Sequence, residues 1–398
     1  MKRWRSSLAG AVVALMVGAA SASAADLEIG FVGSMTGARA NLAVDQLDGF
    51  RLGLRHLGGR LGGLETALTV LDDARDTEKA KQAADELWKN GRLHLLLLSS
   101  TAEAAAYVAS QTQGHRTLVI NMGMVPPAMA GRECNPYFFS MVPRGDLIQE
   151  LTGSYLQGKG MKRLAVFEPP GRQDMLTAFR RGYKGEVTEI VSRPGTMDFS
   201  PDLQKLAKTK VDGAYVLHSG GMAVEFLLQY QGGGFKDSTP LFAPSGVLDQ
   251  TVLAASQPAG QGMFSVAPWT DDLDSPANHR MEADFEADYG RPVSLRAAAG
   301  YDAAMLIDAA IRDVKAKIND TDAFRLSVKR VEFPTTRGTF RFDNDQFPLL
   351  HYWVRQVGAD GRGRPINEQR GLLSKDNRDP LAGECPMSPA PPPAPAKK

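Results

Sequence analysis

In this 398-residue chain, the residues that could carry out catalysis do not have the sequence spacings of known catalytic motifs. Gly153, Gly158 and Lys159 have the spacing of a phosphate-binding loop. However, Gly160 occupies the position at which Ser or Thr would bind magnesium, and the run falls within a predicted helix instead of following a strand. The glycine pattern of a dinucleotide site does not follow the first predicted strand, and the sequence has no nucleophile elbow. The sequence therefore predicts a protein that is not an enzyme.

The histidines and the clustered acidic residues do not predict a metal or cofactor site. The six histidines are scattered, and none pairs with another at metal-ligand spacing. His218 follows a predicted strand, where it either contacts a ligand or is an ordinary loop histidine. Asp72, Asp73 and Asp76 are compatible with a cation site, but a solvated acidic loop is the favoured interpretation. We expect no cofactor and no bound metal.

Polar residues that directly follow a predicted buried strand are better suited to binding than to catalysis. Ser100 and Thr101 stand between the apolar run 93–98 and a predicted helix over 102–113. Their hydroxyls and backbone N–H groups lie beside a helix N-terminus, an arrangement that suits a carboxylate. The alternative interpretation of these two residues is an ordinary helix cap.

The elements that would position these residues alternate along the chain. Most of the apolar, strand-like runs are followed by a helix with one apolar face. This alternation predicts parallel sheets that are covered by helices on both faces. Residues 276–330 are predicted to be mainly helical, and the periodicity is lost after about residue 373. The predicted strands lie at 27–32, 67–72, 93–98, 117–120, 137–142, 164–167, 186–191, 212–217, 241–243, 262–267, 338–342 and 350–357.

The first 24 residues predict an export signal. Three basic residues among the first five precede a short apolar run over 8–17, and 22–24 has the small-x-small pattern of a cleavage site. The alternative, an uncleaved anchor, is disfavoured because the apolar run is too short to span a bilayer. Cleavage near Ala24 would leave 43 basic and 45 acidic side chains, so the charge gives no reason to expect nucleic acid or an anionic membrane as a partner.

Several segments, read together in their order, resemble landmarks of a known family. The chain resembles the type I periplasmic substrate-binding proteins, specifically the leucine/isoleucine/valine-binding branch of ABC importers, over nearly its whole mature length. The segments that carry the resemblance are Val32-Gly33-Ser34-Met35-Thr36-Gly37-Ala38-Arg39-Ala40, Asp198-Phe199-Ser200-Pro201, residues 213–221, and Ala299-Gly300-Tyr301-Asp302-Ala303-Ala304.

The resemblance implies an α/β, two-lobed type I periplasmic binding protein-like fold. Each lobe would be a parallel sheet flanked by helices, and three hinge crossings would join the lobes. It further implies a periplasmic monomer that binds a small molecule in its cleft and docks on an inner-membrane ABC permease. The crossings are expected near 143, 271 and 347, the first lobe at 25–143 plus 272–346, the second at 144–271 plus 347–385, and a disordered Pro/Ala-rich tail at 386–398.

The resemblance also implies ligand-binding residues in the first lobe. In the family, the equivalent of Ser100 and the next strand-end loop, here Met122 and Gly123, hold the carboxylate of the ligand. Thr101 belongs to the same loop as Ser100. Leu42 falls where an amino-acid binder carries a large side chain against the ligand, although a helical leucine is equally compatible with the core.

The second lobe departs from the family pattern. Gln173 stands where a tyrosine is expected, and Ser219 and Gly220 follow their strand without one. Ser245 stands where amino-acid binders place an acidic residue that pairs with the ammonium of the ligand. A neutral hydroxyl cannot offset the desolvation of an ammonium group as a carboxylate does. We therefore expect an organic or aromatic acid in preference to an α-amino acid.

Other interpretations stay open. The apolar body of the ligand would lie against Leu42, Met122 and Met124, and Arg39 or Arg172 could supply a charge partner, although a surface arginine is the favoured reading of each. Branched-chain amino acid binding is one alternative function. A sensory or accessory binding protein without a permease is another, and an exported α/β enzyme is the least favoured.

The two cysteines predict a disulfide. An even number of cysteines in an exported protein favours a bridge over a catalytic thiol. The fold implied by the resemblance brings Cys134, just before the first crossing, near Cys385, just after the last ordered segment. Such a bridge would attach the C-terminal segment to the first lobe.

Overall fold

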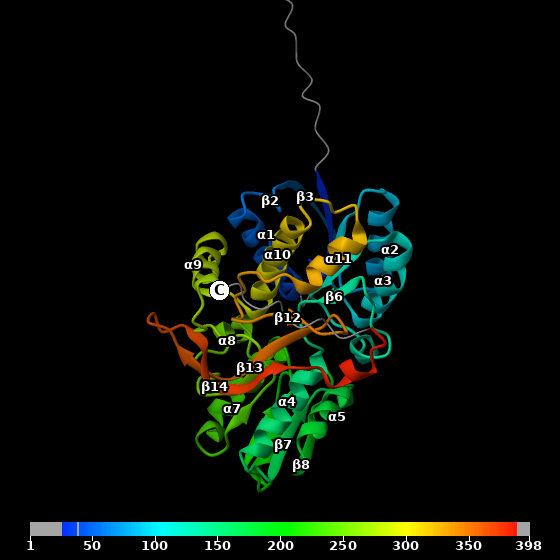
Figure 1. Cartoon of the computed structure of the whole chain (residues 1–398). Coiled ribbons are helices and arrows are strands. Elements are labelled where there is room, and N and C mark those ends of the chain that lie inside the picture. The colour runs from blue at the N-terminus through cyan, green and yellow to red at the C-terminus, as the bar shows by residue number, and fades with distance from the viewer. Residues whose placement is uncertain (1–25, 38–39, 388–398) are drawn as a thin grey trace, which may run out of the picture.

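The computed structural model describes residues 26–37 and 40–387 as two α/β lobes, one above the other in Figure 1. The predicted export signal, Arg39 and nearly all of the predicted C-terminal tail lie outside the described residues. Within the described part of the chain, no helix is both long enough and apolar enough to cross a membrane.

The first lobe is built on a six-stranded sheet in the order β2-β3-β1-β4-β5-β6. The strands from β3 to β6 run parallel, and β2 forms a short antiparallel hairpin with β3. The central strand β4 is buried along its whole length, as its unbroken leucine run predicts. The elements are β1 Leu27–Gly33, β2 Arg60–Leu61, β3 Leu64–Asp72, β4 Leu95–Ser99, β5 Leu118–Asn121, β6 Phe138–Ser140, α1 Asn41–His56, α2 Thr77–Lys89, α3 Ala102–His115, η1 Pro127–Ala130, α9 Pro276–Tyr289, α10 Leu295–Asp313 and α11 Thr321–Arg330.

Helices α1 and α10 pack against each other closely enough to require glycine. A Cβ atom at Gly49 would lie 2.0 Å from the carbonyl oxygen of Ala297, and one at Gly300 would lie 1.9 Å from that of Gln46. The two backbones therefore touch, and α10 is held rigidly against the helix that follows the first strand. This contact fixes where the start of α10 stands relative to the first sheet.

The second lobe contains a sheet in the order β12-β13-β11-β10-β9-β7-β8, with β14 paired to β13. Strands β7 to β11 run parallel, whereas β12, β13 and β14 are antiparallel additions, so the expected parallel sheet is a mixed one. The elements are β7 Arg163–Glu168, β8 Glu186–Val191, β9 Gly213–Val216, β10 Leu241–Phe242, β11 Phe264–Ala267, β12 Arg341–Phe342, β13 Pro348–Ala359, β14 Pro365–Asn377, α4 Gly145–Gly158, α5 Gln173–Gly182, α6 Ser200–Ala207, α7 Gly221–Gly232, η2 Phe235–Asp237, α8 Gln250–Ala255 and η3 Pro380–Glu384.

Strand β14 is the element that the sequence pattern did not predict. It has few apolar residues and no clear alternation, because much of it is only partly buried. It forms because a tight turn returns the chain alongside β13. In that turn the Asp360 carboxylate accepts hydrogen bonds from the backbone N–H groups of Arg362 and Arg364, at 2.9 and 2.8 Å.

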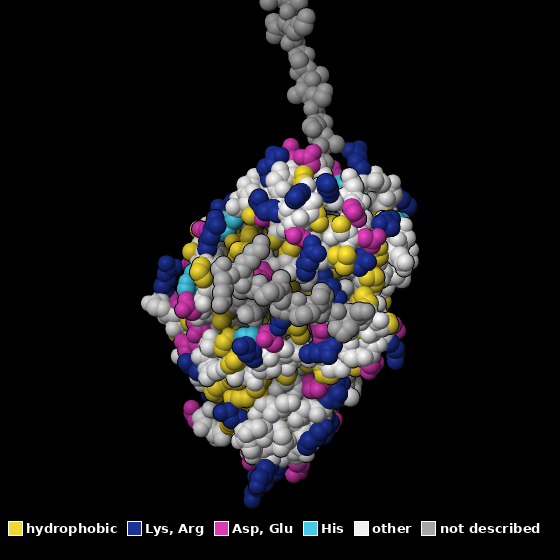
Figure 2. All heavy atoms as spheres, viewed as in Figure 1, with side chains coloured by type: hydrophobic (Ala, Val, Ile, Leu, Met, Phe, Trp, Pro, Cys, Tyr) yellow, Lys and Arg dark blue, Asp and Glu magenta, His cyan; other side chains and the backbone are white. Residues whose placement is uncertain are grey.

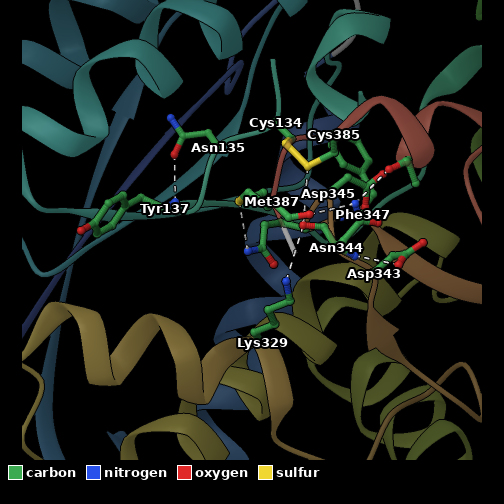
Figure 3. The surroundings of a disulfide bond; sticks show 12 residues. Cys134, Asn135, Tyr137, Lys329, Asp343, Asn344, Asp345, Phe347, Cys385 and Met387 are labelled. Carbon is green, nitrogen blue, oxygen red and sulfur yellow. Dashed lines mark hydrogen bonds between the residues drawn. A yellow bond between two sulfur atoms is a disulfide. The ribbon is translucent and has the colours of Figure 1, made fainter. Parts of the chain in front are cut away.

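The chain passes between the lobes three times before β14, and then a fourth time. The first three passages follow β6, β11 and α11. After β14, residues 378–387, here called the C-terminal passage, run back to the first lobe. There η3 packs beside η1, and a disulfide joins Cys385 to Cys134 with their Cα atoms 5.7 Å apart (Figure 3). The disulfide expected from the two cysteines is thus present.

A buried ion pair joins α10 to two of these passages. Arg337 Nε donates to Asp302 Oδ2 at 2.7 Å, and both side chains are almost completely buried. The same arginine donates through Nη1 to the carbonyl oxygen of Met141, at 2.6 Å, on the first passage. The backbone N–H of Thr336, on the third passage, donates to Asp302 Oδ1 at 2.8 Å. One carboxylate on α10 therefore organises both passages.

A second buried arginine joins the first passage to the C-terminal passage. Arg144 Nε donates to Asp379 Oδ2 at 2.6 Å, and its Nη1 donates to the Asp146 carboxylate at 2.6 Å. Nearby, the Asn344 side chain donates to the carbonyl oxygen of Ala382 at 2.9 Å. The C-terminal passage is therefore fixed by hydrogen bonds and ion pairs as well as by the disulfide.

Replacing both cysteines, Cys134→Ser with Cys385→Ser, is expected to lower the free energy of unfolding by about 2–5 kcal/mol, because the unfolded chain regains the entropy of a very long loop. Thermal unfolding followed by circular dichroism, with and without a reductant, measures this. Wild type should lose stability when reduced, whereas the double variant should be insensitive to the reductant. Equal melting temperatures of the oxidised wild type and the double variant would contradict the expectation.

Asp302→Asn is expected to destabilise the protein by about 3–5 kcal/mol, since it leaves the buried Arg337 guanidinium without its counter-charge. Denaturant unfolding measures the effect. Glu189→Gln serves as the control, because it removes the partner of Arg180 from an ion pair that is nearly half exposed on both sides. That pair should contribute about 1 kcal/mol or less. A loss at Asp302 no larger than at Glu189 would refute the assignment of the buried pair as a structural hub.

Candidate functional site

A buried carboxylate, Asp73, organises the strand-end loops of the first lobe. It follows β3 and is fully buried. Its Oδ1 accepts hydrogen bonds from Ser34 Oγ at 2.6 Å and from the Arg75 backbone N–H at 2.7 Å, and its Oδ2 accepts one from Ser100 Oγ at 2.5 Å. The expected solvated acidic loop is therefore wrong for Asp73. The described residues also contain no cluster suited to a metal ion. The carboxylate instead ties together the loops that follow β1, β3 and β4.

Ser100 and Thr101 have their hydroxyls engaged within the protein. The Ser100 hydroxyl donates a hydrogen bond to Asp73. Thr101 Oγ1 accepts from the Ala104 N–H at 3.3 Å, so this residue is the N-cap of α3, and it also hydrogen-bonds to Thr77 Oγ1 at 2.7 Å. Among the described residues, the backbone N–H groups of Ser100 and Thr101 have no hydrogen-bond acceptor. The hydrogen-bond donors that remain available to an acidic ligand are therefore the backbone N–H groups at the start of α3.

The structure brings Gly123 directly against Ser100. A Cβ atom at Gly123 would lie 2.5 Å from the backbone nitrogen of Ser100, and the next residue, Met124, donates its N–H to the Ser100 carbonyl oxygen at 3.2 Å. Asn121 holds the loop in place, since its Nδ2 donates to the Gly123 carbonyl oxygen at 3.2 Å. The two strand-end loops expected to act together are therefore neighbours.

Met122 and Met124, the two methionines that were expected to contact the ligand, differ in their burial. The Met122 side chain packs in the core of the first lobe and is 3% exposed, while its carbonyl oxygen accepts a 2.6 Å hydrogen bond from Gln46 Nε2. Met124 is 60% exposed. Leu42 lies half-buried in the first turn of α1. Beside it, Asn41 Nδ2 lies 3.5 Å from Thr251 Oγ1 of the second lobe, so this turn of α1 faces α8.

The second-lobe residues expected from the sequence lie at the starts of helices. Gln173 is the exposed first residue of α5. Ser219 is half-buried, and Gly220 is exposed in front of α7 with a φ of +58°, a backbone conformation that favours glycine. His218 is fully buried beside Phe199 and Phe226.

His218 is a core histidine and not a surface loop residue. Its Nε2 lies 3.1 Å from Ser192 Oγ. Burial lowers the pKa of His218 to about 4, so its imidazole is neutral at physiological pH. Neither interpretation of this residue from the sequence, a ligand contact or an ordinary loop histidine, describes it. Its side chain packs against aromatic rings of the second-lobe core.

Ser245 lies in a small pocket that residues of both lobes line. The serine is 6% exposed, and its hydroxyl forms no hydrogen bond with the described residues. The other residues that the sequence analysis predicted at the site, from Leu42 to Gly220, do not line this pocket. The pocket is lined by Ser245, Leu248, Asp249, Gln250, Trp269, Ser294, Leu295, Arg296, Arg355 and Asn367.

Arg296 is the pocket residue that the sequence interpretation missed. It comes from the first turn of α10 and reaches the second lobe, where its Nη1 lies 3.7 Å from Asp249 Oδ2. A Cβ atom at Gly246 would lie 3.4 Å from Arg296 Nη2. The residue stands 51 positions after Ser245 and outside the landmark segment 299–304 of the same helix, so spacing could not associate them. The available signal was a cation at a helix N-terminus, where a positive charge is unfavourable.

The pocket lining carries more positive than negative charge. It contains the guanidinium groups of Arg296 and Arg355 and the carboxylate of Asp249. Burial lowers the pKa of Arg355 to about 10, which still leaves it charged at neutral pH. Burial also raises the pKa of Asp249, while the nearby Arg296 opposes this shift. The charge balance of the lining suits an anion.

Comparison with known proteins agrees with this two-lobed arrangement. A family model described as periplasmic binding protein matches residues 26–362. The leucine-specific-binding protein of Salmonella typhimurium is 26% identical over 310 residues, which cover 73% of this chain and 80% of that protein.

Solved structures show the same fold. A solute-binding protein of an ABC transporter from R. palustris, in complex with benzoate, has a TM-score of 0.79 at 24% identity, covering 90% of this chain and 99% of that one. A second from R. palustris, in complex with 4-hydroxybenzoate, has a TM-score of 0.78 at 21% identity, with the same coverage of both chains.

Gly123→Ala is expected to destabilise the protein by about 1–3 kcal/mol, because the added methyl group must displace the Ser100 backbone. It should also weaken ligand binding through the shifted Ser100 loop. Thermal unfolding and ligand titration measure the two effects. The matched control is Gly114→Ala in α3, where a Cβ atom would meet nothing within 4 Å. If the two variants had the same stability and the same ligand affinity, the contact between Gly123 and Ser100 would be important for neither property.

Proposed function

The chain belongs to the periplasmic binding protein family, and on this premise we propose that it is the solute receptor of an ABC importer and binds a small organic acid between its lobes. The matched family and the curated relative are solute-binding proteins, not enzymes. The proposal extends this shared role to a class of ligand and to a membrane partner.

The observation that carries the proposal is the polarity of the pocket around Ser245. A receptor for an α-amino acid must compensate the ammonium group with a carboxylate or a set of acceptors. Here the serine is neutral, and the lining contains two arginines and one aspartate. Transfer of an ammonium group into this pocket would be unfavourable, which favours a ligand without one.

Aromatic acids are the favoured subclass. Two proteins of the same fold are in complex with benzoate and 4-hydroxybenzoate. In this chain the acid would bind the N–H groups of Ser100 and Thr101, with Gly123 beside them. The apolar body would extend past Leu42 toward Ser245. Gln173, Ser219 and Gly220 complete the proposed second-lobe wall.

Lobe closure would be the signal that the permease reads. Arg296 and Asn41 of the first lobe already stand against Asp249 and Thr251 of the second. A ligand that contacts both lobes stabilises the closed form by its differential affinity for that form. A change from 1:99 to 99:1 closed requires about 5.5 kcal/mol of this difference.

The remaining parts of the proposal follow the family. The chain would be exported with cleavage near Ala24 and would act as a monomer in the periplasm. The proposed lobes are 25–143 with 272–346 and 144–271 with 347–385. Positive and negative side chains are interspersed over the face shown in Figure 2, which is compatible with a freely diffusing protein.

Branched-chain amino acid binding is the second candidate, and two observations favour it. The curated relative is a leucine-specific-binding protein, and Asp249 supplies one carboxylate in the pocket. Against it, Arg296 stands 3.7 Å from that carboxylate and would compete with a ligand ammonium.

Calorimetric titration of the purified protein with benzoate, 4-hydroxybenzoate, leucine and isoleucine tests the proposal. We expect binding of at least one acid and no binding of the amino acids. Ser245→Glu should weaken acid binding by about tenfold or more, since it places a like charge in the pocket. Ser110→Glu adds the same charge to an exposed position of α3 and should leave binding unchanged. Tight leucine binding by the wild type, without acid binding, would overturn the proposal.

A further inference from the structure

The pocket contains hydrogen-bond donors that the protein does not use. Ser245 is more than nine-tenths buried, and its hydroxyl has no partner among the described residues. Arg296 donates no hydrogen bond within the same part of the chain, and the nearest carboxylate oxygen, of Asp249, lies 3.7 Å away, beyond hydrogen-bond distance. The Arg296 side chain is 24% exposed, so its donors can reach solvent or a ligand. The donors of both side chains are therefore available to an acceptor that comes from outside the protein.

We propose that Arg296, together with Ser245, binds a second acidic group of the ligand, so that the preferred ligands are dicarboxylic acids. This inference rests on the proposed function, in which a first carboxylate binds the N–H groups of Ser100 and Thr101. A guanidinium group only donates hydrogen bonds, so the group that it binds must be an acceptor. A carboxylate fits its two parallel N–H donors best.

The placement of Arg296 on its helix supports a binding role. Ser294 is the N-cap of α10, and Arg296 is the second residue of that helix. A cation in the first turn meets the positive end of the helix dipole, which is unfavourable. Residues that violate a local preference in this way are concentrated at functional sites. Here the helix end and the guanidinium add to one positive potential at the pocket.

Neighbouring carboxylates do not neutralise this potential. The α1 residues Asp45 and Asp48 are already paired with Arg291, at 2.7 and 2.6 Å. Asp45 also accepts the Ser294 hydroxyl at 2.5 Å. Asp249 is shared between Arg296 and α8. It is the N-cap of α8, where its Oδ1 accepts a hydrogen bond from the Val252 N–H at 3.0 Å. The nearest counter-charge of Arg296 is therefore Asp249, at 3.7 Å, which also caps α8.

The position of the pair also connects ligand recognition to lobe closure. Arg296 belongs to the first lobe and Ser245 to the second. A carboxylate that contacts both residues joins the lobes directly. A monocarboxylic acid held only at Ser100 and Thr101 would lack this contact, so the second acidic group should favour the closed form.

Matched ligand pairs test the inference. Calorimetric titration would compare benzoate with benzene-1,4-dicarboxylate, and propionate with succinate. In the wild type, we expect the second carboxylate to tighten binding about tenfold or more in at least one pair. Arg296→Gln should remove this gain, so that the two members of the pair bind with affinities within about twofold of each other. The control is Arg312→Gln on the same helix, since that side chain is 60% exposed and paired with Asp308; it should bind both ligands as the wild type does.

A second variant tests the contact between Arg296 and the second carboxylate of the ligand by a change that should strengthen it. Asp249→Asn retains the cap of α8, because asparagine caps as well as aspartate. It removes the carboxylate that competes for Arg296, so it should increase the affinity gain that the second carboxylate brings over the matched monocarboxylic acid.

The outcomes separate this inference from the proposed function. If the wild type binds neither acid of any pair, the proposed function fails and the inference fails with it. If monocarboxylic acids bind and the second carboxylate brings no gain, the proposed function stands and the inference is overturned. Equal weakening of both members of a pair by Arg296→Gln would assign the arginine to lobe contact alone, and would also overturn it.

Discussion

The buried ion pair between Asp302 and Arg337 is the interaction on which the arrangement of the two lobes depends. Two charges removed from water are stable only when each is paired and hydrogen-bonded. Here the arginine also binds the Met141 carbonyl oxygen, and the carboxylate also accepts the Thr336 N–H. The requirement to satisfy one buried charge therefore fixes α10 relative to two passages between the lobes.

The same helix links this pair to the pocket. Arg296 precedes Asp302 by six residues, about 9 Å along the helix axis at 1.5 Å per residue. The glycine contacts between α1 and α10 hold this length of helix against the first lobe. One end of a rigid segment thus anchors the hinge region, and the other carries the guanidinium that faces the second lobe. Any movement of the lobes must change the surroundings of Arg296.

Much of the fold could be predicted from the sequence, because its central strands are continuous apolar runs and its helices have caps and apolar faces. Strand β14 could not be predicted in this way, since pairing with β13 and the Asp360 turn stabilise it despite a polar sequence. The site was less predictable. The contact of Ser100 with Gly123 follows from adjacent strand ends. Whether Met122 and His218 face a ligand or the core depends on side-chain direction, which composition does not reveal. Asp73 was misread because its partners lie in two other loops.

The disulfide has a topological consequence. Cys134 and Cys385 are 251 positions apart, so the bridge closes a covalent ring that contains the whole second lobe and all four passages between the lobes. A single backbone cut at any position from 135 to 384 would open this ring without releasing a fragment. The oxidised protein should therefore remain one covalent molecule after nicking in any loop of the second lobe, and the same nick would separate the reduced chain into two pieces.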